Sequence, residues 1–305
     1  MSDEFKVWFN GQLRPFEECT VSVRTHALHY GTSVFEGIRS YRTPDGPRVF
    51  RLTDHLKRFF WSAGVYRMPM RWSLEEIHAA CRETVKVNGL ESAYLRPIAF
   101  RGDCGLGVLP ADLSVIETAI IVNEWGTYLG EGAIERGVEV CVSSWQRVAP
   151  NTIPAGAKAG GNYLSSFLIV SEARERGVIE GIALGADGLV SEGSGENVFL
   201  VSDGRILTPP VSASILGGIT RHSAIVLARD LGFEVVEQSL SREQLYAADE
   251  IFFTGTAVEV TPIRKVDHMV IGAGERGPVT RAVQEAFFGL FDGRTEDRWG
   301  WLEPL

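Results

Sequence analysis

The first 122 residues contain segments with a helical period of apolar residues and segments with a strand-like pattern. The segment 53–63 (TDHLKRFFWSA) repeats apolar residues three and four positions apart, which predicts a helix with one buried face. The segment 73–89 (SLEEIHAACRETVKVNG) has the same period, a capping box of Ser73 and Glu76, and a glycine at its end. The predicted apolar positions are Leu56, Phe59, Phe60 and Ala63 in the first helix, and Ile77, Ala80, Cys81, Thr84 and Val85 in the second.

Shorter apolar runs around these helices predict β-strands. The run KVWFNGQL reads as a hairpin that turns at Asn10-Gly11, because Asn-Gly favours the two-residue turns that join antiparallel strands. The runs 93–100 (AYLRPIAF) and 114–122 (SVIETAIIV) predict two more strands. Pro97 has no backbone N–H to donate, so we expect it on an edge strand or at a bulge.

The stretch 123–132 (NEWGTYLGEG) has three glycines and no clear period, as expected of a linker. Beyond it strands and helices are mixed without a regular strand–helix–strand rhythm. The predicted strands are 137–144, 197–208 and 250–256, and the predicted helices are 162–177, 220–232 and 277–293. Each of these helical segments ends in a glycine that fits a left-handed stop.

These patterns predict an α+β (mixed α/β) fold of two domains. A chain of 305 residues can bury a large core, and its length favours two domains over one. We expect a small N-terminal α/β domain over 1–122, an interdomain linker or loop over 123–134, and a larger C-terminal domain of mixed sheet and helices over 135–305.

Charge and composition make some partners improbable. The formal net charge of −9 and the pI near 5.3 argue against nucleic acid or an anionic membrane surface. The start, MSDEFKVWFN, lacks the regions of a signal peptide, and no apolar run approaches the roughly 18 residues of a membrane span. Four widely spaced cysteines predict buried, reduced thiols. We therefore expect a soluble, cytoplasmic protein whose partners are small molecules.

Lys158 is the one lysine of five without charged neighbours in the sequence. It lies in PNTIPAGAKAGGNYLSS, and no other charged residue occurs between Arg147 and Glu172. Such surroundings favour an uncharged, nucleophilic amine, and the glycines and alanines would let a flat cofactor approach the backbone. We interpret Lys158 as a candidate Schiff-base lysine on a strand end or loop, with Tyr163 as a phenol near the same ring. The alternatives are an ordinary loop lysine and a core tyrosine.

The run SEGSGENVF places Glu192 and Glu196 among small residues, just before an apolar strand-like segment. Glycines around a carboxylate permit close approach of a ligand ring. A carboxylate opposite a pyridine nitrogen would keep that nitrogen protonated and make the ring an electron sink. Taken alone, a polar hairpin loop is the simpler interpretation.

Two turns of small residues, LGGITRHSA at 216–224 and TGTAVE at 254–259, could hold a phosphate group. Thr220 is a suitable N-cap, and the N–H groups at a helix start bind phosphate readily. Arg58 on the first predicted helix could add a charge-assisted clamp. Each feature also has an ordinary explanation as a helix cap or a solvated arginine.

The segment THALHYGTSVFEGIR contains His26 and His29, but no Cys, Asp or Glu at ligand spacing before Glu36. We therefore expect no metal site there. Aromatic residues could wall an apolar substrate pocket, with core packing as the alternative. These aromatic residues are Tyr30, Phe35, Tyr94, Trp125 and Tyr128.

A reactive lysine, a ring-facing acid and a phosphate-binding turn together describe pyridoxal phosphate chemistry. On these features the sequence resembles class IV (fold-type IV) aminotransferases, and among them the bacterial branched-chain amino acid group, over nearly the whole chain. The similarity lies in HALHYGTSVFEGIR, AYLRP, APNTIPAGAKAGGNYLSS, SEGSGEN, GITR, TGTA and the tail from GPVTRAVQEAFFGLF to WGW.

The resemblance implies pyridoxal 5'-phosphate as the cofactor. By its pattern Lys158 forms a Schiff base with the cofactor, Glu192 pairs with the pyridine nitrogen, and Tyr163 bonds the phenolic oxygen of the ring. Leu216 would pack against the ring face. The phosphate group is expected at Arg58, Ile219, Thr220 and Thr256.

The resemblance also implies the reaction, a ping-pong transfer of the amino group of L-leucine, L-isoleucine or L-valine to 2-oxoglutarate. The Thr256 and Ala257 amides with Tyr94 would receive the α-carboxylate, and Arg96 the distal carboxylate of glutamate. The substrate side chain would be enclosed by Phe35, Trp125, Tyr128, Tyr163 and a Tyr30 from the neighbouring subunit. Active sites of this kind imply a homodimer or a homohexamer of three dimers.

Two positions depart from the family pattern. Gly217 stands where proline is common, which would loosen the phosphate turn. Arg101 stands at an apolar place, where it could favour acidic substrates or pair with Asp103. Open alternatives are a D-amino acid aminotransferase, an aminodeoxychorismate lyase, an (R)-amine transaminase, a Schiff-base aldolase without a cofactor, and a metabolite-binding protein. The sequence leaves the preferred amino donor and the biosynthetic or catabolic direction open.

Overall fold

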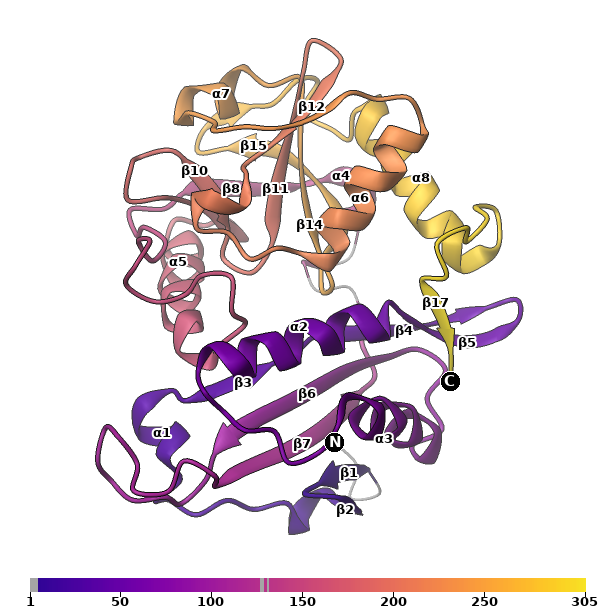
Figure 1. The fold of residues 1–305 in the computed structure, drawn as a ribbon. Helices are drawn as coiled ribbons and strands as arrows, with labels where there is room; N and C mark the ends of the chain where they lie inside the picture. The colour runs from indigo at the N-terminus through magenta and orange to yellow at the C-terminus, as the bar shows by residue number, and fades with distance from the viewer. Residues whose placement is uncertain (1–4, 127–128, 131) are drawn as a thin grey trace.

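The computed structural model describes residues 5–126, 129–130 and 132–305, which form two β-sheets with helices around them (Figure 1). The strands of the first sheet are β1 (Lys6–Phe9), β2 (Gln12–Pro15), β3 (Ser33–Phe35), β4 (Ile38–Thr43), β5 (Gly46–Phe50), β6 (Ala93–Arg101), β7 (Ile116–Asn123) and β17 (Leu302–Pro304). Their order is β17-β5-β4-β6-β7-β1-β2, and β3 also pairs with β6.

The second sheet comprises β8 (Val138–Val142), β9 (Glu180–Leu184), β10 (Val190–Gly193), β11 (Asn197–Ser202), β12 (Arg205–Thr208), β13 (Val235–Glu237), β14 (Glu250–Gly255), β15 (Glu259–Val266) and β16 (Met269–Val270). Their order is β10-β9-β8-β15-β14-β11-β12-β13, with β16 on β15. Three of its pairings are parallel and the others antiparallel, so the predicted mixed α+β fold is confirmed.

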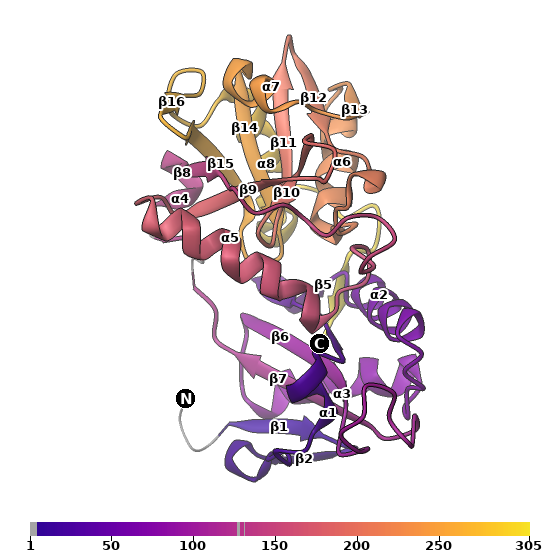
Figure 2. The same ribbon diagram turned by 90° about the vertical axis from the view of Figure 1, so that its left-hand side faces the viewer.

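The helices cover these sheets and fill the space between them. They are α1 (His26–Tyr30), α2 (Leu52–Val65), α3 (Leu74–Val87), α4 (Ala133–Arg136), α5 (Tyr163–Glu175), α6 (Ile219–Asp230), α7 (Arg242–Ala247) and α8 (Pro278–Asp292), with 3-10 turns η1 (Phe16–Glu18), η2 (Gly160–Asn162) and η3 (Val211–Ala213). Helix α2 lies along the boundary between the two sheets, and α5 crosses that boundary when the molecule is turned (Figures 1 and 2).

Helices α2 and α3 form as their apolar periods predict. The five apolar positions expected of α3 are all buried, and its capping box is present at Ser73 and Glu76. In α2, Leu56, Phe59 and Ala63 are fully buried, while Phe60 is partly exposed at the margin of the apolar face. The two helices bury these faces against the first sheet, together with Ile38, Leu95 and Ile120 of its strands.

The hairpin at Asn10-Gly11 is confirmed, since both residues have positive φ, 50° and 92°, between the paired strands β1 and β2. The prediction for Pro97 is wrong: it lies on β6, in the interior of the sheet, opposite Ile120. Its carbonyl accepts the N–H of Glu36, in the short gap between β3 and β4. The missing N–H of Pro97 faces that gap, where the neighbouring strand is interrupted.

Helices α6 and α8 pack against one face of the second sheet, and the predicted glycine stops are confirmed at Gly177, Gly232 and Gly293, each with positive φ. The segment 197–208 is two strands and not one. Asp203 and Gly204 have φ of 50° and 73° and turn β11 into β12, an Asp-Gly signal that the strand interpretation missed.

The chain ends on the first sheet, where β17 pairs with β5. The last strand of the segment predicted as the second domain, 135–305, thus belongs to the first sheet. Pairing between segments so distant in the chain leaves no local signal in the sequence. A second contact between the two halves of the molecule is the stacking of Tyr41, on β4 of the first sheet, on Phe291 of α8, with ring centroids 3.6 Å apart. The four cysteines are free thiols, three of them buried and Cys19 half-buried.

We predict that Ser73→Ala lowers the free energy of unfolding by about 1 kcal/mol, because the Ser73 hydroxyl accepts the N–H of Glu76 at the start of α3. The midpoint of urea unfolding measures this loss. Ser73→Asp keeps an acceptor at the same place and is the control. An Ala variant as stable as the Asp variant would contradict the assigned cap.

Candidate functional site

A cleft with an empty volume of about 540 Å³, open to solvent at its mouth, lies between α2, the segment before α5 and the start of α6. All eight residues predicted for the cofactor line it, although they are spread over nearly 200 positions. They are Arg58, Lys158, Tyr163, Glu192, Leu216, Ile219, Thr220 and Thr256.

Lys158 lies on the loop between β8 and η2, and its backbone is fixed by the other half of the molecule. The Lys158 N–H donates to the Ser62 hydroxyl of α2 at 3.1 Å, and its carbonyl accepts the N–H of Phe35 at 3.0 Å. A Cβ at Gly160 would clash with the Ser33 hydroxyl oxygen, so a larger residue would have to displace that side chain. Small neighbours thus hold the amine between the two sheets.

The amine of Lys158 donates to the phenol oxygen of Tyr163 at 2.8 Å, and it lies 5.2 Å from the centroid of the Phe35 ring. The Phe35 and Tyr163 rings pack with centroids 4.8 Å apart. The loop and the first residue of α5 therefore present an amine and a phenol side by side, as the five-residue spacing allowed.

The Glu192 carboxylate is buried and engaged on both oxygens. The Arg147 guanidinium lies 2.7 Å from one oxygen, and the other accepts the Asn197 side-chain amide and the Leu216 N–H, both at 3.0 Å. Burial raises the pKa of Glu192, while Arg147 and the Leu216 N–H oppose that rise. This is a fixed acid with a strong affinity for a proton or a protonated ring nitrogen.

Glu196 also lines the cleft, but it has a different environment from Glu192. Its carboxylate accepts the Gly195 N–H, and burial together with the neighbouring Glu180 carboxylate raises the pKa of Glu196 well above its usual range. The uncharged form of Glu196 is therefore favoured, which distinguishes it from the arginine-paired Glu192.

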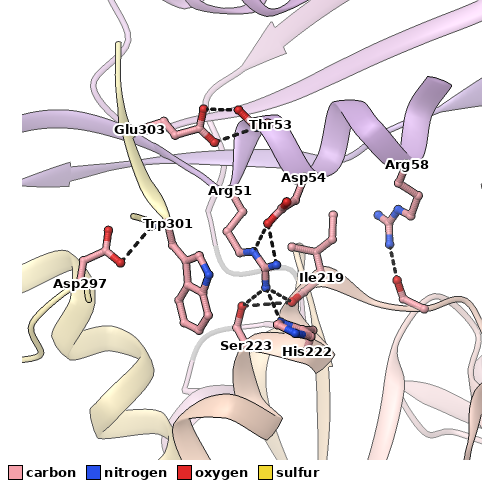
Figure 3. Close-up of polar contacts among 11 residues, drawn as sticks. Arg51, Thr53, Asp54, Arg58, Ile219, His222, Ser223, Asp297, Trp301 and Glu303 are labelled. Carbon is pink, nitrogen blue, oxygen red and sulfur yellow. Dashed lines mark hydrogen bonds and ion pairs between the residues drawn. The ribbon is translucent and has the colours of Figure 1, made fainter. Parts of the chain in front are cut away.

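The start of α6 offers an anion site. The first N–H groups of a helix lack intrahelical acceptors, and here they belong to Ile219 and Thr220. A Cβ at Gly218 would lie 2.0 Å from the Asn197 amide oxygen, so this turn requires a glycine. Arg58 of α2 reaches the same turn and donates to the Gly217 carbonyl at 2.9 Å (Figure 3).

The Arg58 guanidinium is oriented by Glu36, which is fully buried. Nε and Nη2 of Arg58 lie 2.7 and 2.8 Å from the two carboxylate oxygens, and the His55 ring lies 2.7 Å from one of them. Burial alone would raise the pKa of Glu36, but Arg58 and His55 lower it far below its usual range. Glu36 is thus a permanent anion that fixes Arg58.

The residues predicted for the substrate side chain form a row next to Lys158. Arg96 lies 4.6 Å above the Phe35 ring and donates to the Tyr94 phenol oxygen at 2.7 Å. Tyr94 in turn stacks on Trp125, with centroids 4.4 Å apart. Thr256 lines the cleft and Ala257 follows it in the chain, at the end of β14.

Tyr30, predicted for the substrate pocket, does not line this cleft. Tyr30 lies on α1, exposed, where its hydroxyl donates to the Leu106 carbonyl. Its expected role belongs to a second subunit and stays a prediction. Tyr128 lies outside the described residues.

The two interpretations of Arg101 are wrong. Its buried guanidinium donates to the backbone carbonyls of Tyr66, Arg67 and Leu113 at 2.9 to 3.1 Å, and Asp103 pairs with Arg24. Arg101 therefore joins the end of α2 to the loop before β7.

Sequence reasoning did not assign a role to Glu36, and it missed Arg147, Asn197 and His55. Glu36 and Asn197 stand inside motifs that were recognised, but their side-chain bonds, to His55 and Arg58 and to Glu192 and the Leu216 carbonyl, form only in the folded chain. Arg147 is the last charge before the neutral stretch around Lys158, and that position was its only signal.

The histidines of α1 hold the local backbone. His26 bonds the Thr32 hydroxyl and the Gly107 carbonyl, and His29 bonds the Val23 carbonyl. In the described part of the chain there is no group of three or more His, Cys, Asp or Glu side chains that could hold a metal ion. No helix among the same residues is long and apolar enough to cross a membrane.

Comparison with known proteins gives one consistent set of relatives. Residues 33–266 match the family model of class IV amino-transferases. The chain is 55% identical over 299 residues to the branched-chain-amino-acid aminotransferase of Escherichia coli (strain K12), covering 98% of this chain and 97% of the relative. The similarity thus includes both sheets and the cleft.

Solved structures agree with these matches. A crystal structure of the E. coli branched-chain amino acid aminotransferase has a TM-score of 0.98 and 54% identity, covering 99% of both chains. The branched-chain amino acid aminotransferase of Thermobaculum terrenum, in its PLP-bound holo-form, has a TM-score of 0.91 and 33% identity, covering 100% of this chain and 99% of the other. The fold is therefore the same throughout its length.

We predict that Glu36→Gln lowers the free energy of unfolding by about 3 kcal/mol near neutral pH, because it leaves Arg58 buried without its counter-ion. A group whose folded pKa is depressed stabilises the protein above its unfolded pKa, about 4.3 for glutamate. The difference between wild type and variant should therefore be constant from about pH 6 to 8 and shrink as the pH falls below about 4.3.

Urea unfolding at several pH values measures this difference. The exposed pair Arg42–Glu91 supplies the control, since Glu91→Gln should change the stability little at any pH. A Glu36→Gln loss that is small, or that grows toward acid pH, would show that Glu36 is not the buried anion described here.

Proposed function

The chain belongs to the class IV aminotransferase family, and we propose that it transfers the amino group of L-leucine, L-isoleucine and L-valine to 2-oxoglutarate. It is a branched-chain-amino-acid aminotransferase that depends on pyridoxal 5'-phosphate. The observation that carries the proposal is the meeting of Lys158, the arginine-paired Glu192 and the start of α6 in one cleft. No single one of these features would suffice.

The residues of the cleft fit the cofactor at each of its functional groups. Lys158 would bind the aldehyde carbon, Glu192 the pyridine nitrogen, and the N–H groups of Ile219 and Thr220 with Arg58 the phosphate. Tyr163 would bond the phenolic oxygen, with Leu216 on the ring face and Thr256 beside the phosphate. Pyridoxal phosphate, when bound, supplies the electron sink that stabilises a carbanion at the substrate Cα.

Lys158 then acts as the general base. Its amine takes the proton from the substrate Cα, a transfer that typically contributes about 10²–10⁴-fold. The Tyr163 phenol, 2.8 Å away, holds the amine in position as the proton moves. Arg147 orients the Glu192 carboxylate and favours its ionised form against the effect of burial, and the Glu196 carboxyl adds no second anion beside it.

The two substrates differ most at the end of the side chain. An apolar wall of Phe35, Tyr94 and Trp125 suits a branched aliphatic chain, and Tyr94 with the Thr256 and Ala257 amides would receive the α-carboxylate. Arg96 at the edge of this wall would pair with the distal carboxylate of glutamate. With an aliphatic substrate it keeps its bond to Tyr94 and its contact with Phe35.

We also infer a cytoplasmic homodimer or homohexamer in which Tyr30 of the partner subunit and Tyr128 complete the pocket. Support comes from exposed apolar side chains around α1 and the loop after β6, where Val23, Leu28, Val108 and Leu109 are 64–83% exposed. Bonds from His26 and His29 hold these segments together. Such a surface on a soluble protein suits a subunit contact.

A panel of half-reactions tests the function. The spectrum of the bound cofactor should change rapidly with L-leucine, L-isoleucine, L-valine and L-glutamate, and slowly or not at all with D-alanine and a primary amine. Lys158→Ala should lose at least about 10²-fold in rate, and borohydride reduction of the wild type should leave a covalent adduct on Lys158.

Lys265→Ala is the control, because Lys265 lies at the surface and pairs with Glu139. An adduct on another residue would reject Lys158 as the reactive amine. The absence of a response to every branched L-amino acid would reject the proposed substrates.

We predict that Arg96→Ala weakens the half-reaction with glutamate by about 10–100-fold, the usual effect of losing a charged hydrogen bond. The half-reaction with leucine should change only a few-fold, because leucine has no distal carboxylate that Arg96 could bind. Comparing kcat/KM for both half-reactions measures this. An equal loss for the two substrates would show that Arg96 supports the wall and does not select the carboxylate.

A further inference from the structure

A second arginine near α2, Arg51, also reaches the start of α6 (Figure 3). Its guanidinium Nη1 lies 3.2 Å from the Ile219 carbonyl, 2.9 Å from the Ser223 hydroxyl and 2.9 Å from Nδ1 of His222. These three acceptors all belong to the beginning of α6. Because Arg58 bonds the Gly217 carbonyl, the two arginines fix this end of the helix from two sides.

The Arg51 guanidinium is unfavourable beside the start of α6 unless an anion accompanies it. The N-terminal end of a helix carries a partial positive charge, which repels a cation. Asp54 accepts from Nε of Arg51 at 2.7 Å and is the acid that pairs with it. Arg51 is only 8% exposed, so solvent screens its charge little. Arg51 and the helix start together favour an additional anion.

The end of the chain holds Arg51 in place. The N–H of Arg51 donates to the Trp301 carbonyl at 2.7 Å, and the guanidinium lies 5.0 Å above the Trp301 ring. Asp297 accepts the N–H groups of Trp301 and Leu302, and Glu303 accepts the N–H and hydroxyl of Thr53 (Figure 3). The C-terminal segment is thereby tied to the beginning of α2.

The backbone of Arg51 agrees with a role for its side chain. Its φ is 54° and its ψ 40°, a left-handed conformation that glycine or asparagine adopts at lower cost. Glycine at position 51 would suit this backbone conformation better, but the bonds from the Arg51 guanidinium to α6 would be lost.

We propose that Arg51 is a positioning residue for the phosphate group of the cofactor, and that the C-terminal segment 297–305 holds Arg51 in that role. The inference rests on the proposed function only in placing the phosphate at the start of α6. It assigns to Arg51 no contact with substrate or with the reacting atoms.

The test compares pyridoxal 5'-phosphate with pyridoxal, which lacks the phosphate. Cofactor is removed from the holoenzyme and each compound is titrated back while the absorbance of the bound form is followed. Arg51→Gly should bind pyridoxal 5'-phosphate at least about tenfold more weakly than the wild type, and pyridoxal within about twofold of the wild type. Arg51→Lys should recover part of the loss, and Trp301→Leu should act in the same direction as Arg51→Gly.

Arg101→Met is the matched control, since Arg101 is a buried arginine at the other end of α2 whose bonds are to backbone carbonyls. It should change both affinities equally or not at all. Ser223→Ala removes one acceptor of Arg51 with little risk to folding, and should weaken the binding of pyridoxal 5'-phosphate alone by about threefold.

An equal loss of both affinities in Arg51→Gly, or an unchanged ratio in both Arg51→Gly and Ser223→Ala, overturns the positioning role. If Arg51→Gly does not fold, an unchanged ratio in Ser223→Ala overturns it by itself. A wild-type protein that binds neither compound contradicts the proposed function instead, so the two failures are distinguishable.

Discussion

A charge buried in this cleft is stable only where a partner of opposite sign and enough hydrogen bonds accompany it. Glu36 satisfies this condition through Arg58 and His55, which hold its pKa far below the usual range. At Glu192 burial raises the pKa, and Arg147 with the Leu216 N–H opposes that rise. Glu196 has a carboxylate neighbour instead of a cation, so its neutral form is favoured. The pairing of charges therefore separates three buried acids: Glu36 orients Arg58, Glu192 lies beside Arg147, and Glu196 lies beside another carboxylate.

Close contact between backbones explains why Lys158 has no charged neighbours in the sequence. Its segment passes between α2 and β3, where a Cβ at Gly156 would lie 3.2 Å from the Trp61 ring and one at Gly160 would meet Ser33. Bulky or charged neighbours would separate the two sheets at this point. The same small residues that admit a flat ring also join the two halves of the molecule, so binding and folding impose the same demand on the segment around Lys158.

Local patterns predicted what is local. The apolar period and capping box of α3, the Asn-Gly hairpin and the glycine stops depend on residues a few positions apart, and each forms as expected. Pro97, the C-terminal strand and the partners of Arg101 could not be predicted, because their environments are made by segments far away in the chain. The residues predicted for the cofactor were selected through whole motifs in order, whereas Arg147 lies outside the quoted motifs. It could be found only by seeing which carboxylate it reaches in the folded protein.

The arginines of the site bear on the binding of both the cofactor and the substrates. Both are anionic, while the chain has a net charge of −9, so positive potential must be concentrated where they bind. Arg58 and Arg147 pair with buried glutamates, and Arg51 pairs with the partly exposed Asp54. Among the ion pairs of the described residues none includes Arg96, whose guanidinium instead bonds the Tyr94 phenol and covers the Phe35 ring. Aromatic faces lower the cost of a cation without a carboxylate by an attraction of about 0.5–1 kcal/mol each, less than a charged hydrogen bond supplies. Arg96 can therefore remain in place beside an aliphatic side chain and still gain from a carboxylate, which is what a pocket serving two such substrates in turn requires.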